Sequence, residues 1–269
     1  MAEIAVEGLV HVYREGEVRA LDGIDLRIGI GERVALVGQN GSGKTTLVRH
    51  LNGLLRPTEG RVTVDGTDAA TLTVAQLAAR VGLVFQDPDR QIFAGSVRAE
   101  AEFGPRNLGR SGADLRAAVA DALAATGLDR EERTNPYDLG GSRRKLLALA
   151  SVLAMRTPVL VLDEPTTGQD ARGVARVRDV VEAVAAGGRT VVAISHDMRF
   201  VADVFERVVV MRAGQVILDG TPAVVFGRES WEALQSTYLE PPLAAVVGDR
   251  LGLGSTPTDA SLVEALAAQ

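Results

Sequence analysis

The feature that most constrains the fold is the segment Gly38-Gln39-Asn40-Gly41-Ser42-Gly43-Lys44-Thr45, which matches the pattern G-x-x-x-x-G-K-[ST]. It follows a short apolar run, Arg33 to Val37, and precedes a helix-compatible stretch from Thr45 to Leu54. This motif is informative where it joins a buried strand to the N-terminus of a helix. The sequence supplies that context and therefore predicts a phosphate-binding loop.

The residue types in this loop suit the phosphates of a nucleotide. Glycines let backbone N–H groups turn toward phosphate, and the helix N-terminus adds partial positive charge. We expect Lys44 to reach the β- and γ-phosphates and Thr45 to ligate magnesium. The alternative is a glycine-rich turn with an incidental lysine, which the flanking strand and helix disfavour. The ligands expected here are ATP and Mg²⁺, held by Gly38, Asn40, Gly41, Ser42, Gly43, Lys44, Thr45 and Thr46.

Length and composition narrow the class of protein. A chain of 269 residues has room for one large α/β domain with a subdomain and a short appendage. The absence of cysteine excludes disulfides, thiol catalysis and cysteine-ligated metals. A net charge of −6 gives no general attraction to nucleic acid, so we expect no such partner. Because no uncharged apolar run approaches about 20 residues, any membrane role is expected to come through a partner.

The spacing of hydrophobic residues changes along the chain. Loose alternation predicts an antiparallel β layer near the N-terminus, in residues 4–12, 24–28 and 61–64. Between about 87 and 156 the period becomes helical, with apolar stripes in 113–126 and 143–155. Glycine and proline, including Gly104 and Pro105, punctuate this stretch. We interpret it as a helical insert in an α/β core.

Strand–helix alternation returns after the insert. The expected elements are strands at 159–162, 190–194 and 207–211 and a helix from about 171 to 186. Near-continuous apolar strands indicate a parallel sheet covered on both faces. The predicted fold class is α/β, a P-loop NTPase (RecA-like) core with an N-terminal antiparallel β layer. The expected domains are an ATPase domain at 1–225, with its helical subdomain at about 87–156, and a short C-terminal extension at 226–269 that ends in a helix-like segment, 260–268.

Two further strands end in residues that suit nucleotide chemistry. Asp163 and Glu164 follow the apolar run Val159 to Leu162; we expect Asp163 to hold magnesium and Glu164 to act as general base or to position water. Acidic residues commonly begin loops, so this pattern gains weight only behind the complete P-loop.

His196 follows the run Val191 to Ser195, at a strand end where ligand crevices open. We expect it to contact the γ-phosphate and Glu164, although a histidine there is often only solvated or packed.

The order of these parts resembles the nucleotide-binding subunit of ABC transporters over nearly the whole chain. Gln86 lies ahead of the helical insert, and Asp163-Glu164-Pro165 lies behind it. The resemblance implies ATP hydrolysis and assigns further roles: Tyr13 stacks on adenine, Gln86 links magnesium to a membrane partner and assists catalysis, Asp170 is the D-loop aspartate, and His196 is the switch histidine. Without the resemblance, Tyr13 would be interpreted as a half-buried strand aromatic.

Three segments and the C-terminal extension are similar to the energy-coupling-factor subgroup of these proteins; the segments are 85–93, 103–109 and 165–170. The resemblance implies an importer of vitamins or of cobalt or nickel. Its partners would be a second ATPase subunit in a hetero- or homodimer, a transmembrane coupling protein, and a separate substrate-binding membrane component. The chain would then lie peripherally on the cytoplasmic face of the membrane. Glu100 and Glu102, after Gln86, are candidates to contact arginines of the membrane partner, although acidic residues on a helix are more often only solvated.

One segment departs from the family pattern. Where the family has Leu-Ser-Gly-Gly-Gln, this chain has Leu139-Gly140-Gly141-Ser142-Arg143. Three small residues and a hydroxyl keep backbone approach to phosphate possible, so Gly140, Gly141 and Ser142 are expected to contact ATP bound by the second subunit. Arg143 either helps to bind phosphate or joins a basic surface with Arg144 and Lys145.

This departure favours a heterodimer with two unequal ATP sites. It also leaves open an ATP-gated dimerisation module with little turnover. A further alternative is an ABC-type ATPase acting on nucleic acid, but such proteins usually carry long inserts or paired ATPase domains, neither of which this sequence contains.

Overall fold

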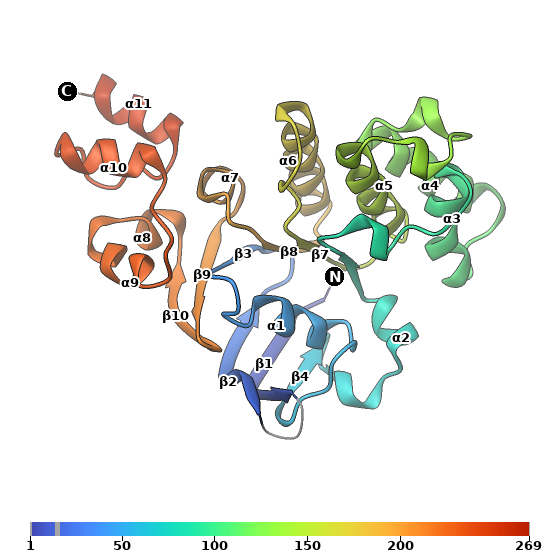
Figure 1. Cartoon of the computed structure of the whole chain (residues 1–269), viewed down its shortest axis with the longest axis horizontal. Coiled ribbons are helices and arrows are strands. Elements are labelled where there is room, and N and C mark those ends of the chain that lie inside the picture. Colours follow the sequence, from blue (N-terminus) through green and yellow to red (C-terminus); the bar gives the residue numbers. More distant parts are fainter. Residues whose placement is uncertain (1, 14–16, 269) are drawn as a thin grey trace.

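The computed structural model describes residues 2–13 and 17–268, which form two β-sheets and several groups of helices (Figure 1). The first sheet has the order β2-β1-β4-β5 and is antiparallel. Its strands are β1 (Ile4–Tyr13), β2 (Val18–Ile28), β4 (Glu59–Val64) and β5 (Thr67–Asp68). This confirms the predicted N-terminal antiparallel layer.

The second sheet has the order β10-β9-β3-β8-β7-β6. All neighbours in it are parallel except β10, which pairs antiparallel with β9. Its strands are β3 (Arg33–Val37), β6 (Val81–Val84), β7 (Val159–Asp163), β8 (Thr190–Ile194), β9 (Arg207–Arg212) and β10 (Gln215–Gly220). The predicted α/β class with a parallel core is confirmed.

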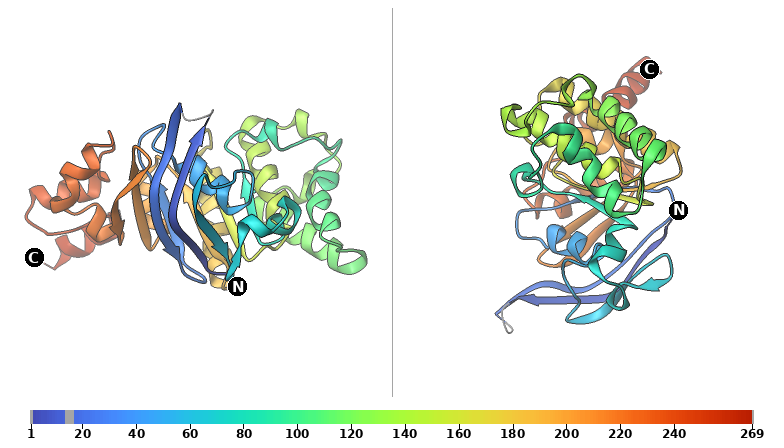
Figure 2. Two further views of the ribbon diagram at one scale, coloured as in Figure 1. Left: turned by 90° about the horizontal axis from the view of Figure 1, so that it is seen from below. Right: turned by 90° about the vertical axis from the view of Figure 1, so that its right-hand side faces the viewer.

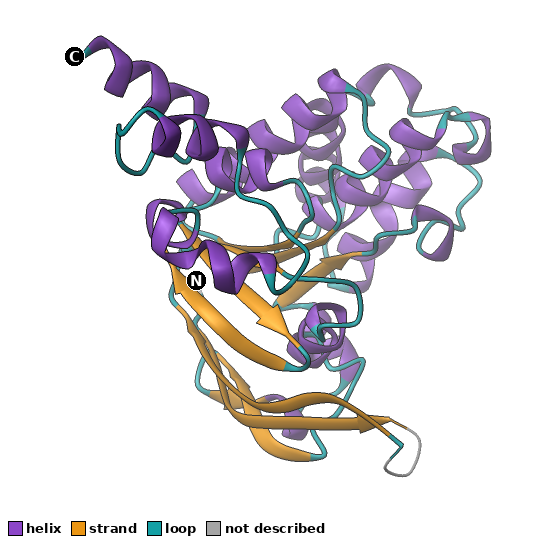
Figure 3. Ribbon diagram, turned by 60° about the vertical axis from the view of Figure 1, so that its left-hand side comes forward, coloured by secondary structure: helices purple, strands orange, loops and turns teal. Residues whose placement is uncertain are grey.

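The inner strands of the second sheet, such as β7 and β8, are almost entirely apolar because both faces of the sheet are covered there. In β7, Val159 and Val161 pack toward the antiparallel layer, whereas Leu160 and Leu162 pack toward the helices on the other face. Successive side chains of a strand point to opposite faces, so burial on both sides requires an unbroken apolar run. Figure 3 shows the two sheets on one side of the molecule and most of the helices on the other.

The helices fall into three groups around the sheets. Within the core are α1 (Lys44–Leu51), α2 (Val74–Ala78), α6 (Ala171–Ala186) and α7 (Met198–Val204). A helical subdomain contains α3 (Val97–Asn107), α4 (Gly112–Thr126) and α5 (Gly141–Leu153). The C-terminal part contains α8 (Pro222–Val225), α9 (Trp231–Gln235), α10 (Leu243–Arg250) and α11 (Asp259–Ala267). The last two groups lie on opposite sides of the sheets (Figure 2).

Two local expectations are corrected. Helix α3 runs through Gly104 and Pro105, which the sequence placed at an interruption. Pro105 lies in the last turn, and Gly104 is required because a Cβ there would come within 2.6 Å of Met155 Cγ. The C-terminal extension also holds more structure than its weak pattern indicated, since α10 begins directly after Pro242.

None of the helices in the described part of the chain has the length and apolar character that a membrane span needs.

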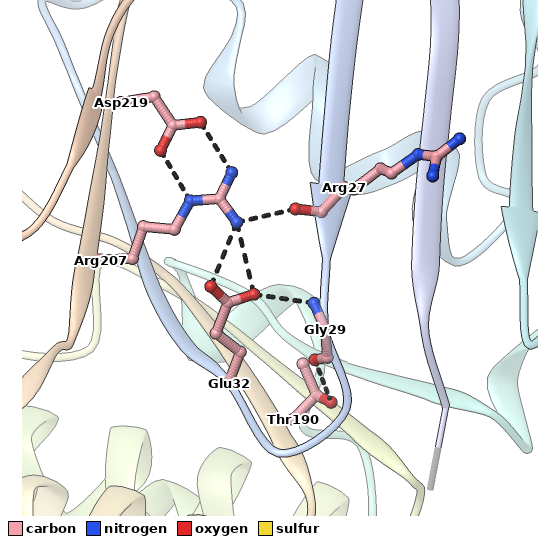
Figure 4. Close-up of polar contacts among 6 residues, drawn as sticks. All are labelled: Arg27, Gly29, Glu32, Thr190, Arg207 and Asp219. Atoms are coloured by element: carbon pink, nitrogen blue, oxygen red, sulfur yellow. Dashed lines mark hydrogen bonds and ion pairs between the residues drawn. The ribbon is translucent and has the colours of Figure 1, made fainter.

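Arg207 on β9 ties several elements of the two sheets together (Figure 4). Its Nε and Nη2 donate to the two carboxylate oxygens of Asp219 on β10, at 2.6 and 2.7 Å. Its Nη1 donates to the carbonyl oxygen of Arg27 on β2 at 2.8 Å and to Glu32 Oε1 at 3.1 Å. Glu32 in turn accepts from the backbone N–H of Gly29 at 2.7 Å. These charge-assisted contacts raise the pKa of Arg207 and fix the turn that precedes β3.

Replacing Arg207 by Met is expected to lower the free energy of unfolding by about 2 kcal/mol, because Asp219 and Glu32 both lose a charged donor. The matched control is Arg61→Met, since Arg61 and Glu7 form an exposed pair with 61% and 39% of their side chains accessible. That change should cost less than about 1 kcal/mol. Urea unfolding of the two variants checks the difference, and equal losses would contradict the role given to Arg207.

Candidate nucleotide-binding site

Three parallel strands bring the sequence-predicted residues to one edge of the second sheet. Strand β8 lies between β3 and β7 and is parallel to both. The P-loop follows β3, Asp163 and Glu164 lie at the end of β7, and His196 follows β8. They surround a pocket of about 330 Å³. Its lining includes the expected residues Tyr13, Asn40, Gly41, Ser42, Gly43, Lys44, Thr45, Thr46, Gln86, Asp163, Glu164 and His196.

Two of the P-loop glycines, Gly38 and Gly43, lie where a side chain does not fit. Gly38 has φ 144°, and a Cβ there would lie 2.1 Å from the carbonyl oxygen of Met211. Gly43 has φ 103°, and a Cβ there would lie 2.6 Å from the carbonyl oxygen of Ala20. Left-handed backbone and close approach both require glycine. The loop sequence is therefore set by backbone geometry as well as by its ligand.

Lys44 lies folded inside the loop. Its Nζ donates to the carbonyl oxygens of Gly38 at 2.6 Å and Gln39 at 2.9 Å, and its side chain is buried. Burial lowers the pKa of Lys44, while the charges of Glu164 and Asp163 oppose that change. A lysine held in this way is a buried ammonium group at the base of the pocket.

Asp163 and Glu164 place two buried carboxylates beside the loop. Their exposed fractions are 7% and 4%. Burial raises the pKa of both side chains, as it disfavours their charged forms. Thr45 Oγ1 donates to Asp163 Oδ2 at 3.4 Å. Glu164 has φ 52°, a left-handed conformation that is uncommon for residues other than glycine.

The two oxygens of Glu164 have different surroundings. His196 Nε2 lies 2.9 Å from the buried Oε1. Oε2 accepts from Thr167 Oγ1 at 3.2 Å. Burial and the charge of Lys44 lower the pKa of His196, which favours its neutral form. Thr167 had no role in the sequence prediction; its place three residues after Glu164 is the signal that marks it.

Tyr13 and Gln86 approach the pocket from other elements. Tyr13 ends β1, and its hydroxyl is hydrogen-bonded to Thr46 Oγ1 at 3.2 Å. His11 packs edge-on against the Tyr13 ring, with centroids 4.5 Å apart. Gln86 lies exposed just after β6 and also lines the pocket. Arg19 and Ala20 on β2 line it as well, and no pattern in the sequence indicated them.

Gly140, Gly141, Ser142 and Asp170 do not line this pocket. Asp170 caps α6 by accepting the N–H of Gly173 at 2.7 Å. At the start of α5, Ser142 Oγ donates to Gln169 Oε1 at 2.5 Å, and Gln169 Nε2 donates back to the Ser142 carbonyl at 3.2 Å. The Ser142 hydroxyl therefore donates its hydrogen bond to a residue of its own chain.

The basic residues after Ser142 are also paired within the chain. Arg143 contacts Glu131 and donates to the carbonyl oxygen of Gly127 at 3.0 Å. Arg144 lies 3.2 Å from Asp89, and Lys145 donates to the carbonyl oxygen of Thr167 at 2.6 Å. Of the two alternatives for Arg143, its contacts with Glu131 and Gly127 within the chain give no support to phosphate binding, and Arg144 likewise has an acidic partner.

The donor set of the pocket fits a hard divalent cation. Thr45 Oγ1, the Asp163 carboxylate and the Gln86 amide all line it, and Mg²⁺ prefers such oxygen ligands. Asp163 is buried, and no Lys or Arg forms an ion pair with it among the described residues. Within residues 2–13 and 17–268, no group of three or more His, Cys, Asp or Glu side chains is arranged to hold a metal ion. That agrees with magnesium bound by one or two carboxylates together with phosphate oxygens.

A second, apolar groove lies beside α3, with a volume of about 330 Å³. Phe93 and Phe103 line it, 59% and 49% exposed, with their rings edge-to-face 4.7 Å apart. Glu100 is 3% exposed and accepts the N–H groups of Phe93 and Ala94 at 3.0 and 2.8 Å. The expectation that Glu100 is free to meet a partner's arginine is wrong, since backbone donors already use it.

Glu102 is likewise engaged. It accepts from Arg98 at 2.9 Å and from Arg106 at 2.5 Å. These hydrogen bonds lower its pKa against the opposing effect of burial. Exposed aromatic rings, rather than free carboxylates, therefore dominate this face of α3.

Comparisons with known proteins agree with this geometry. A family model described as ABC transporter matches residues 21–167. The energy-coupling factor transporter ATP-binding protein EcfA2 of Symbiobacterium thermophilum is 40% identical, over 98% of this chain and 94% of that protein. EcfA1 of the same organism is 43% identical, over 98% and 96%.

Solved structures show the same likeness. The structure of cbiO1 from Clostridium perfringens, described as part of the ABC transporter complex cbiONQ, has 35% identity and a TM-score of 0.76; the match covers 87% of this chain and 94% of that one. An ATP-binding cassette in a dimeric post-hydrolysis state, bound to ADP and Pi, has 26% identity and a TM-score of 0.73, covering 81% and 98%.

Proposed function

Because the chain belongs to the ABC transporter ATP-binding family, in its energy-coupling-factor group, we propose that it drives an importer for a vitamin or a transition-metal ion. The observation that carries the proposal is the meeting of the P-loop, Asp163, Glu164, Gln86 and His196 around one pocket. The names of EcfA1, EcfA2 and the cbiO1 complex support the class of transporter.

In this proposal each residue of the pocket has a definite task. Tyr13 stacks on adenine, and the loop from Gly38 to Thr46 holds the phosphates, with Lys44 turning from the loop carbonyls to the β- and γ-phosphates. Glu164 Oε1 accepts a proton from the attacking water, and His196 contacts both Glu164 and the γ-phosphate. Thr167 holds Glu164 through Oε2, while Oε1 lies beside His196 and accepts that proton.

Magnesium would be held by Thr45, Asp163 and Gln86. When bound, it neutralises the charge that develops on the transferring phosphoryl group. Gln86, exposed and next to the helical subdomain, is then suited to report the state of the pocket to a membrane partner.

The catalytic unit we propose is a dimer of ATPase subunits with two unequal sites. The segment 139–143 and Asp170 lie outside the pocket of their own chain, which suits residues that face a partner's nucleotide. Here Ser142 is bonded to Gln169 and Arg143 to Glu131, so neither side chain is free for phosphate. We infer a heterodimer in which the site with Lys44 and Glu164 hydrolyses ATP against the partner's signature, while the opposite site is slower.

Turnover by the purified chain, alone and with a candidate second ATPase, tests this arrangement. The heterodimer predicts low turnover alone and a large rise on mixing. A fully active homodimer would rule out the heterodimer, and ATP binding without turnover in either sample would favour the alternative of an ATP-gated dimerisation module.

The apolar groove beside α3 is the proposed contact for the membrane protein. Phe93 and Phe103 present exposed rings there, and aromatic residues commonly anchor protein interfaces. The cargo itself is expected to be chosen by a separate membrane component. The identity of membrane proteins that co-purify with the tagged chain tests the importer proposal directly, because their substrate pocket reveals the cargo.

Phe103→Asp is expected to reduce that co-purification about tenfold or more, since it places a charge where an apolar partner surface would be buried. The control is Leu54→Asp, an exposed apolar residue outside the groove. Quantitative mass spectrometry of the recovered membrane proteins measures both. Unchanged recovery with Phe103→Asp would place the docking site elsewhere.

A further inference from the structure

We propose that His11, held in place by His50, is a positioning residue for Tyr13: it fixes the tyrosine ring relative to the P-loop and so strengthens binding of the nucleoside part of ATP. The proposal rests on the role proposed above for Tyr13, stacking on adenine. The chain has three histidines, and only His196 has a task in the proposed ATP chemistry. His11 and His50 are both buried, with 8% and 1% of their surfaces exposed.

His50 belongs to the helix that follows the P-loop. Helix α1 packs on the antiparallel sheet that contains β1 (Figure 1). Within α1, His50 Nδ1 lies 2.7 Å from the carbonyl oxygen of Thr46. Because a carbonyl oxygen only accepts, Nδ1 carries a proton and donates it, and Nε2 of the neutral ring is an acceptor. Burial lowers the pKa of His50, which favours this neutral ring.

The acceptor nitrogen of His50 faces a donor on β1. His50 Nε2 lies 3.1 Å from His11 Nδ1, and the two rings are inclined at 74°. His11 Nδ1 also lies 3.1 Å from the carbonyl oxygen of Arg56, which follows α1. Since both of these neighbours are acceptors, His11 Nδ1 carries a proton that they share. The His11 ring is therefore held by two groups from the segment that follows the P-loop.

The other contact of the His11 ring is with Tyr13. The two ring centroids lie 4.5 Å apart and the rings are inclined at 81°, the edge-to-face arrangement that aromatic pairs favour. The Tyr13 hydroxyl is hydrogen-bonded to Thr46 Oγ1 at 3.2 Å. The contacts thus run from Thr46 through the two histidines to Tyr13 and back to Thr46, which makes a closed circuit of four side chains on β1 and α1.

This circuit joins the two ends of the nucleotide pocket. Thr46 and Tyr13 line the pocket, at the proposed phosphate and adenine ends, whereas His11 and His50 do not line it. The histidines therefore act on the ligand only through Tyr13. A ring that is already held in place loses less freedom when a base stacks on it, and such preorganisation increases affinity. A purely structural pair would stabilise the fold but would not favour the nucleoside over the phosphates.

Calorimetric titration of the whole chain with ATP and with inorganic tripolyphosphate, both in the presence of Mg²⁺, tests the proposal. We expect His11→Leu to lower ATP affinity about fivefold, because stacking on Tyr13 weakens, and to change tripolyphosphate affinity less than about twofold. The matched control is Val6→Ala, which shortens a buried side chain elsewhere on β1 and should change neither affinity. Thermal melting shows whether each variant is folded.

A double variant separates positioning from a structural role. Tyr13→Leu should itself lower ATP affinity about tenfold, since the base loses its aromatic support. In that background, adding His11→Leu should change ATP affinity less than about twofold, because no ring is left to position. If His11→Leu lowers ATP affinity as much without Tyr13 as with it, the histidine acts on the fold and the proposal is wrong.

The outcomes also separate this proposal from the proposed function. If ATP binds no better than tripolyphosphate, or if Tyr13→Leu keeps full ATP affinity, the adenine role of Tyr13 fails and the role of His11 fails with it. If Tyr13→Leu loses affinity and His11→Leu does not, only the positioning role fails. Should His11→Leu not fold, His11→Asn decides instead: its amide still donates to the buried acceptors but offers Tyr13 no ring, so ATP affinity should again fall, and full affinity would overturn the proposal.

Discussion

Glutamine in place of Glu164 is expected to lower ATP turnover by about 100-fold or more while ATP binding is retained. Glu164 lines the pocket, its Oε1 lies 2.9 Å from His196 Nε2, and burial raises its pKa, which makes it a stronger base. The amide of glutamine keeps the size and the contact with Thr167 but is not a base. Turnover measured with the second ATPase present, alongside ATP affinity, separates loss of chemistry from loss of binding.

The matched control for this substitution is Glu182→Gln on α6, where the side chain is exposed and outside the pocket. It should leave both turnover and affinity unchanged. If wild-type turnover is already as low as that of Glu164→Gln while ATP still binds, general-base catalysis by Glu164 is wrong. That result would instead favour a module that dimerises around ATP.

The site could be predicted from the sequence because its parts follow from strand order and local motifs. The P-loop, Asp163-Glu164 and His196 each end an apolar run, and parallel strands place such ends at the same edge of a sheet. The sequence did not show that β8 lies between β3 and β7, because strand order depends on tertiary pairing. Within the P-loop, left-handed glycines and close contacts allow few other residues, so the local sequence is diagnostic.

What the sequence did not predict depends on tertiary contacts. Glu100 had the appearance of an exposed helix acid, yet it is buried because the N–H groups of Phe93 and Ala94 turn toward it. The pair of Ser142 and Gln169 joins residues 27 positions apart, and no periodicity encodes such a contact. Helix α3 continues through Gly104 and Pro105 although both residue types have low helix propensity. A Cβ at position 104 would lie 2.6 Å from Met155 Cγ, a tertiary contact that a propensity argument does not include.

The lysine of the P-loop should govern nucleotide affinity more strongly than any other side chain of the pocket. Lys44→Met is expected to weaken ATP binding about 100-fold or more, because each charge-assisted hydrogen bond to phosphate is worth about 1.5–3 kcal/mol and a factor of ten corresponds to 1.4 kcal/mol. Lys44 also bonds to the carbonyl oxygens of Gly38 and Gln39, so a melting curve must show that the variant is folded.

The sequence provides an unusually clean comparison for that variant, since Lys44 and Lys145 are its only lysines. Lys145 donates to the carbonyl oxygen of Thr167 and does not line the nucleotide pocket, so Lys145→Met should keep ATP affinity within a few-fold of the wild type. Equal loss of ATP affinity in both variants would mean that Lys44 does not contact the phosphates directly.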